Sequence, residues 1–200
     1  MTAQSLIAFN LILMAALASP GAAFLMSVKT SVGAGRAAGI ATGLGLSLAA
    51  VCWTVAAFLG LEAVFKVFPW AFNAIKIAGA LYLIWIAIQT WRNARKPLPD
   101  VNVPNGRAIL SGLLVNFGNP KSMLFAAALL VVVFPQGLTA PNMALILANH
   151  FTPEVLFYTT CAVTLSSAPA RAGYLRAKPI FDRIAALALG GFGLKLLTGK

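Results

Sequence analysis

The sequence predicts an all-α membrane protein of about six transmembrane helices, and three observations support this prediction. Hydrophobic residues make up 60% of the 200 residues, whereas charged residues make up only 10%. A soluble domain normally carries about 25% charged residues. The apolar residues gather in long runs, and these runs do not alternate apolar with polar residues as membrane strands do. Because backbone groups in lipid must hydrogen-bond within the protein, the runs are expected to be helices.

The apolar runs nearly exhaust the chain. A bilayer core of roughly 30 Å takes about 20 apolar helical residues for each crossing. The connections between runs are short and leave no room for a soluble domain, so residues 1–200 are expected to form a single transmembrane domain. The expected spans cover residues 5–28, 38–65, 70–90, 108–134, 142–168 and 180–198.

The basic residues between the spans predict the orientation of the chain in the membrane. Connections rich in lysine and arginine stay in the cytoplasm. The even connections hold only Lys66, so the odd connections are expected inside and both termini in the periplasm. The bases of the odd connections are Lys29, Arg36, Arg92, Arg95, Lys96, Arg107, Arg171, Arg176, Lys178 and Arg183. Lying between apolar runs and not in a patch with aromatics, they argue against nucleic acid as a partner, despite a net charge of +11.

The longest polar stretch, 92–107, divides the chain into two halves of three spans each. This stretch is basic and contains Pro97, Pro99 and Pro104. Halves with an odd number of spans have opposite orientations, so 1–91 and 108–200 are expected to form two inverted repeats. Secondary transporters commonly have such repeats, with the binding site between them near the bilayer midplane.

A helix-start signal interrupts the middle of the first span and of the fourth span. Ser19 precedes Pro20 in the first, and Asn119 precedes Pro120 in the fourth. Serine and asparagine are favoured N-caps, and proline is favoured at the next position. Each span is therefore expected to break at its proline, with the free N–H groups of a second half-helix facing the break. Two such ends would form a carboxylate site; the alternative is a pair of proline kinks that only shape packing.

Two charged residues lie at about mid-depth in the apolar runs. Burying Lys121 costs at least about 2.5–3.5 kcal/mol on insertion scales, so it is expected to face an interior and hold an anionic group; a structural pair is the alternative. Glu154 is the candidate for proton coupling, with binding of a substrate ammonium or neutralisation of Lys121 as alternatives. His150, one turn earlier, is expected to be a hydrogen-bonded or interfacial histidine and not a proton relay.

Small residues and cysteines add two further expectations. Gly35, Gly39 and Gly43 recur every four residues, which favours close approach of helices and permits a homodimer. Cys52 and Cys161 lie inside separate apolar runs and form neither a disulfide framework nor a CxxC pair. No cofactor and no resident metal ion are expected.

Several segments resemble the LysE/RhtB family of amino-acid exporters. In the first half they are SPGAAFL (19–25), GRAAGI (35–40), GLG (43–45), FNAIK (72–76) and GALYL (79–83). In the second half they are NFGNPK (116–121), LF (124–125) and FPQ (134–136). The chain departs from the family pattern at Ala22, where a second proline is usual, and at Gly137, where phenylalanine is usual.

The resemblance implies export of amino acids or close derivatives from the bacterial cytoplasm, driven by a proton or ion gradient. The expected substrate-binding residues are Ser19, Pro20, Gly21, Asn116, Asn119, Pro120 and Lys121. An exporter of divalent metal or other small cations with related architecture is the alternative, although it would need several Asp, His or Cys residues at mid-depth. A membrane enzyme would need clustered nucleophiles or carboxylates, so no enzymatic activity is expected.

Overall fold

The computed structural model describes residues 2–18, 21–68, 70–96, 107–134 and 138–198. Within these residues the protein is built of α-helices, and no strand is present, which confirms the predicted all-α class. The helices are α1 (Ala3–Ala18), α2 (Ala22–Ala34), α3 (Arg36–Val67), α4 (Ala71–Asn93), α5 (Ala108–Phe117), α6 (Pro120–Val133), α7 (Ala140–Leu165) and α8 (Ala168–Thr198).

Each predicted apolar run corresponds to one long helix or to two consecutive helices. The second, third and fifth runs are α3, α4 and α7. The first run is divided between α1 and α2, and the fourth between α5 and α6. α1 and α2 meet at 59°, and α5 and α6 meet at 66°.

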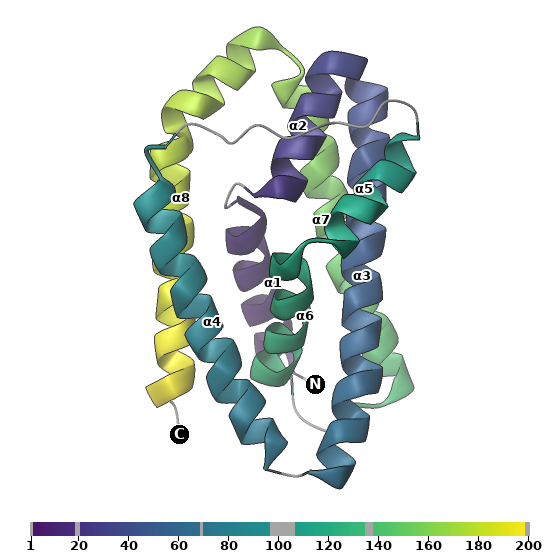
Figure 1. The fold of residues 1–200 in the computed structure, drawn as a ribbon, viewed down its shortest axis with the longest axis vertical. Helices are drawn as coiled ribbons and strands as arrows, with labels where there is room; N and C mark the ends of the chain where they lie inside the picture. The colour runs from purple at the N-terminus through teal and green to yellow at the C-terminus, as the bar shows by residue number, and fades with distance from the viewer. Residues whose placement is uncertain (1, 19–20, 69, 97–106, 135–137, 199–200) are drawn as a thin grey trace.

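The prediction for the last connection was wrong. The connection between the runs 142–168 and 180–198, with the bases Arg171, Arg176, Lys178 and Arg183, was expected to be a loop, but these residues belong to α8, which begins at Ala168. Lysine and arginine are good helix formers, so a basic segment need not interrupt a helix. In Figure 1 the first part of α8 crosses one end of the molecule before the helix turns to run along α4.

Two of the described helices are long and apolar enough to cross a membrane by themselves: Arg36–Gly60 of α3, and α4. Counting each bent pair as one span raises the number to four. α7 and α8 have 26 and 31 residues, but they carry polar side chains that the protein buries, among them His150, Glu154 and Asp182.

The helices form three groups in space (Figure 1). α4 and α8 run side by side on one edge, and α3, α5 and α7 form the other. α1 and α6 lie between these groups. The α2–α3 turn, the C-terminal end of α4 and the α7–α8 turn lie at one end of the molecule, whereas the α3–α4 turn lies at the other.

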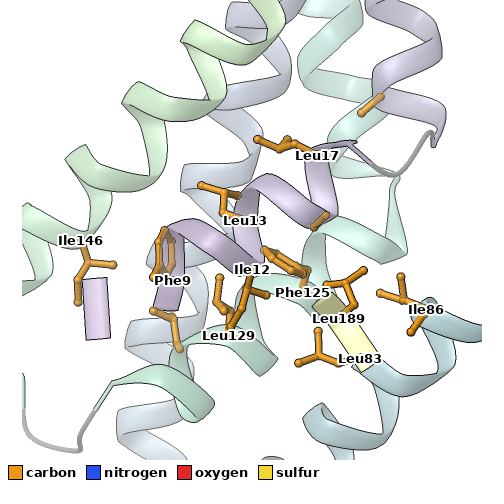
Figure 2. Packing of buried hydrophobic residues seen from close by; sticks show 14 of the residues in the cluster. Phe9, Ile12, Leu13, Leu17, Leu83, Ile86, Phe125, Leu129, Ile146 and Leu189 are labelled. Carbon is orange, nitrogen blue, oxygen red and sulfur yellow. The ribbon is translucent and has the colours of Figure 1, made fainter. Parts of the chain in front are cut away.

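The packing centre lies around α1, as Figure 2 shows. Apolar side chains from α1, α4, α6, α7 and α8 meet there. They are Phe9, Ile12, Leu13, Leu17, Leu83, Ile86, Phe125, Leu129, Ile146 and Leu189. Since lipid is as apolar as these side chains, van der Waals contacts and not exclusion from water hold the helices together.

Glycines allow α3 to approach three neighbouring helices closely. A Cβ atom on Gly45 would collide with the carbonyl oxygen of Ile109 in α5, and one on Gly112 would collide with that of Thr42 in α3. Gly39 lies against Ser31 of α2, and Gly43 against Tyr158 of α7. Gly39 and Gly43 of the predicted stripe therefore pack against helices of their own chain, whereas a Cβ atom on Gly35 would meet nothing within 4 Å.

Candidate functional site

A small cavity of about 50 Å³ lies where α1, α2, α3, α6 and α7 come together. Its polar lining consists of the side chains of Asn119, Lys121, Ser122, His150, Glu154 and Tyr158. Its remaining lining is apolar or glycine: Leu13, Ala16, Leu17, Gly21, Ala23, Phe24, Ala50 and Phe125. Since a buried water needs about 10–15 Å³ by this measure, the cavity holds only a few waters, or a group of similar size.

The first turn of α6 forms one wall of the cavity. Proline at the start of α6 has no N–H to satisfy, and the Asn119 side chain caps the helix by accepting a hydrogen bond from the backbone N–H of Lys121 at 3.0 Å. The Lys121 Nζ donates to the carbonyl oxygen of Ala16 at 3.1 Å. The lysine therefore links the start of α6 to the last turn of α1.

Gly21, the N-cap of α2, lies beside this lysine. A Cβ atom on Gly21 would be 3.8 Å from the Lys121 Nζ. The structure thus brings three of the predicted substrate-binding residues, Gly21, Asn119 and Lys121, to one cavity. Two others, Ser19 and Pro20, lie outside the described residues, and Pro120 opens α6.

Asn116 does not line the cavity, but it hydrogen-bonds to two residues that do. Its Nδ2 donates to the carbonyl oxygen of Leu46 in α3 at 2.7 Å. Its Oδ1 accepts from the Asn119 Nδ2 at 3.4 Å and from the Ser122 hydroxyl. Because Asn116 is 2% exposed and connects α3 with the start of α6, it fixes the position of this turn.

α7 contributes the opposite wall through a buried pair of ionisable residues. The Nε2 of His150 lies 3.5 Å from the Oε1 of Glu154, and both side chains are almost completely buried. The Nδ1 of His150 is 2.9 Å from the Thr54 hydroxyl of α3. The Oε2 of Glu154 is buried without a hydrogen-bond partner among the described residues.

The structure therefore places a cation and a carboxylate on one cavity. Lys121 and Glu154 both line it, from α6 and α7. The sequence predicted both residues at mid-depth but not that they share a cavity. Their opposite charges suit a ligand that carries both an anionic and a cationic group.

Sequence reasoning missed Ser122, Thr54 and Tyr158. All three are small or amphipathic residues inside apolar runs, and their contribution depends on which face of the helix meets a neighbour. The position of Ser122 next to Lys121 was a usable signal, because the first turn of a half-helix surrounds its own N-terminus.

A second buried ion pair lies outside the cavity, on α8. The Lys178 Nζ is 2.8 Å from Asp182 Oδ2 and also donates to the carbonyl oxygens of Asn93 and Ala94 at 3.2 and 3.1 Å. Lysine thus caps the C-terminal end of α4, where the helix dipole favours a cation. No role was predicted for Asp182 from the sequence.

Metal ligation has little support at this site. Among the described residues, no group of three or more His, Cys, Asp and Glu side chains is arranged to hold a metal ion. The cavity offers one imidazole and one carboxylate, and its other polar groups are hydroxyls, an amide and an ammonium. A site for a divalent cation would normally have more oxygen, nitrogen or sulfur ligands and no ammonium.

Fold and cavity together define a multi-pass helical membrane protein with a small charged cavity between helices that meet at sharp angles. Residues 14–200 match the LysE type translocator family, and the chain belongs to this family of membrane transporters. No solved structure matches the chain.

Its relatives include named efflux proteins. The threonine efflux protein of Escherichia coli (strain K12) is 28% identical over 192 residues, covering 92% of this chain and 93% of the relative. The threonine efflux protein of Salmonella typhimurium is 30% identical with the same coverage. The homoserine/homoserine lactone efflux protein of Salmonella typhimurium is 36% identical over 129 residues, covering 59% of this chain and 57% of the relative.

Proposed function

We propose that this protein is a secondary transporter, not an enzyme, which exports amino acids or close derivatives across the bacterial inner membrane. Membership of the translocator family and the names of the efflux relatives support the direction of transport and the class of substrate. The observation that carries the proposal is the shared cavity of Lys121 and Glu154, since a free amino acid carries one charge of each sign.

In this proposal the substrate carboxylate binds near Lys121. The ammonium group of Lys121 lies beside Gly21 at the start of α2, and its backbone N–H lies in the first turn of α6. Two helix N-termini and a lysine together favour an anion. The broken helices are proposed to be halves of spans one and four, with the predicted breaks at Pro20 and Pro120.

The chain is proposed to work by alternating access, as two inverted three-span repeats within one domain. The first repeat comprises α1 to α4 and the second α5 to α8. The turn after α2, the end of α4 and the start of α8 lie at one end of the molecule, and these carry most of the basic residues outside the spans. By the positive-inside rule this end is proposed to be cytoplasmic and the termini periplasmic.

Coupling to the proton gradient is proposed to use Glu154. This carboxylate is 5% exposed, lines the cavity and touches a histidine, which is the residue type that titrates nearest to neutral pH. A buried carboxylate of this kind is typical of proton pathways in membrane transporters.

The proposed function is tested by substrate exchange in proteoliposomes. Purified protein in liposomes loaded with an unlabelled amino acid should take up the same radiolabelled amino acid from outside. A panel of threonine, homoserine, homoserine lactone and the common amino acids identifies the substrate. Exchange of none of these compounds, with Zn²⁺ or Co²⁺ transported instead, would contradict the proposal and favour the cation exporter.

A further inference from the structure

The hydrogen bonds around His150 indicate which of its ring nitrogens carries the proton when the imidazole is neutral. Nδ1 is 2.9 Å from the Thr54 hydroxyl, and this hydroxyl also lies 3.2 Å from the carbonyl oxygen of Ala50 in its own helix. A threonine hydroxyl has one proton, and a carbonyl oxygen can only accept. With the Thr54 proton on the Ala50 carbonyl, Thr54 accepts from Nδ1–H, and the Nε2 of a neutral imidazole then faces the carboxylate without a proton.

This arrangement requires a proton between His150 and Glu154. Without one, the lone pair of Nε2 would face the negatively charged Oε1 at 3.5 Å, where both side chains are almost completely buried. With one, the pair is either an imidazolium beside a carboxylate or an imidazole beside a carboxylic acid. Both forms have no net charge, whereas the pair without the proton carries one negative charge.

The second oxygen of Glu154 lacks the donor that a buried carboxylate requires. Oε2 is buried, has no hydrogen-bond partner among the described residues, and belongs to a side chain that lines the cavity. A buried acceptor without a donor is destabilising. A primary ammonium group, which has three donors and a positive charge, would satisfy this oxygen.

We propose that Thr54, His150 and Glu154 form a one-proton site, and that the ammonium group of the substrate binds Glu154 Oε2 in exchange for this proton. The inference deepens the proposed function and rests on it. In the exchange the proton leaves the pair for water while the ammonium arrives. His150 becomes neutral and Glu154 stays ionised, and the positive charge of the ammonium on Oε2 then replaces that of the proton in offsetting the repulsion between the Nε2 lone pair and the carboxylate. The ammonium replaces the positive charge of the departed proton, the substrate carboxylate lowers the net charge of the cavity by one, and one proton moves for each substrate.

The charged neighbours of the pair are compatible with this exchange. Lys121 of α6 and the Tyr158 hydroxyl of α7 are the other titratable groups lining the cavity. The residues that α1, α2 and α3 contribute to the lining are apolar or glycine. On α8, which also packs against α7, Asp182 is paired with Lys178. Lys121 binds the substrate carboxylate.

The exchange is tested by measuring protons released when substrate binds. Purified protein in weakly buffered detergent solution is mixed with L-threonine, or with whichever amino acid the exchange panel identifies, and a pH indicator reports the protons. About one proton per bound substrate is expected at a pH where the pair is protonated. The apparent Kd should rise about tenfold for each unit of pH below the titration of the pair.

Substitutions separate the contributions of the three residues. Glu154→Gln should abolish proton release. His150→Gln and Thr54→Val should move proton release along the pH scale, because the first removes the imidazole and the second removes the acceptor that fixes its tautomer. Cys161→Ser, on the same helix but outside the cavity lining, should release protons as the wild type does.

Three outcomes would overturn the proposal. The first is substrate binding without proton release at every pH from about 5 to 8, which would leave the proposed function intact. The second is equal proton release by 3-hydroxybutyrate, which lacks the amino group of threonine. The third is binding of no amino acid or homoserine derivative, which would overturn the proposed function together with the exchange.

Discussion

Lys121 shows how the structure holds a partly buried lysine at the cavity that is proposed to bind the substrate carboxylate. Its Nζ donates to the carbonyl oxygen of Ala16 at the end of α1, while its own backbone N–H is held by the cap of α6. The lysine is thus fixed in position before substrate arrives.

Replacing Lys121 is the first prediction at this scale. Lys121→Ala should abolish transport while the protein still inserts, because a hydrogen bond to a charged group contributes about 1.5–3 kcal/mol. That energy corresponds to a loss of roughly 10–100-fold in substrate affinity. Lys121→Arg should be only partly active, since a planar guanidinium does not replace a compact ammonium beside Gly21.

The measurement is amino-acid exchange in proteoliposomes, normalised to the amount of folded protein. Lys96→Ala, at the polar end of α4, serves as the matched control and should exchange at the wild-type rate. If Lys121→Ala exchanges substrate at the wild-type rate, Lys121 has no role in substrate binding.

Glu154→Gln is the second prediction at the residue scale. Glutamine mimics the protonated acid, so the variant should exchange substrate across the membrane but fail to move it against its gradient. The experiment imposes a pH gradient on proteoliposomes and follows accumulation. Asp182→Asn alters the other buried acid and should keep proton-driven accumulation, because Asp182 does not line the cavity.

If Glu154→Gln still accumulates substrate when the pH gradient is imposed, Glu154 is structural. The reverse result, in which only Asp182→Asn loses accumulation, would assign proton coupling to the Lys178–Asp182 pair of α8.

At the scale of elements, the crossing of α3 and α5 depends on the absence of side chains at two positions. Gly45 faces the Ile109 carbonyl, and Gly112 faces the Thr42 carbonyl, so each helix presents a glycine to the backbone of the other. Asn116, one turn after Gly112, then reaches the Leu46 carbonyl of α3 at 2.7 Å. The crossing therefore positions the residues that hold the first turn of α6.

Gly45→Ala should lower the stability of the folded protein by about 1–3 kcal/mol, because the added methyl group forces two backbones apart. Gly60→Ala, in the same helix, is the matched control, since a Cβ atom there meets nothing within 4 Å. It should be neutral or slightly stabilising, as alanine is the better helix former. Thermal unfolding of the detergent-purified variants measures the difference; equal stabilities would contradict the close approach.

The sequence predicted the elements well because apolar length determines them. The runs at 38–65, 70–90 and 142–168 differ from α3, α4 and α7 by a few residues. It failed at α8, because charge alone does not distinguish a loop from a helix that lies across the end of a bundle. Helix length in lipid is a property of one segment, whereas the ends of a polar helix depend on its neighbours.

The site was predictable in part, for a similar reason. Asn119 and Lys121 carry a local signal, since N-capping depends on residues adjacent in sequence. Glu154 was recognisable as an acid in an apolar run. That Thr54 meets His150, 96 positions away, depends on the rotation of α3 against α7, which no local pattern contains.

At the scale of the whole molecule, the distribution of charge between the two ends predicts the topology. The end of α4 and the start of α7 lie at opposite ends of the bundle in Figure 1. Asn93 and Thr139, both exposed, mark these two ends. Single cysteines there, in a background lacking Cys52 and Cys161, should react with impermeant reagents from opposite sides of the membrane. Asn93→Cys should be reached from the cytoplasm and Thr139→Cys from the periplasm.

Labelling in intact cells and in inverted vesicles distinguishes the sides. Reaction of both cysteines from one side would contradict the six-span inverted arrangement. Reaction from opposite sides but with the directions exchanged would keep the spans and reverse the orientation.

The cap that Lys178 places on α4 also has a consequence for biosynthesis. The carbonyl oxygen of Asn93 receives its donor from a residue 85 positions later in the chain. At a synthesis rate of about 5–20 residues per second, the ribosome adds that lysine roughly 4–17 s after Asn93. Until α8 emerges, we expect the end of α4 to bind water or lipid headgroups. The first half of the chain therefore completes its folding only after the last helix has been inserted.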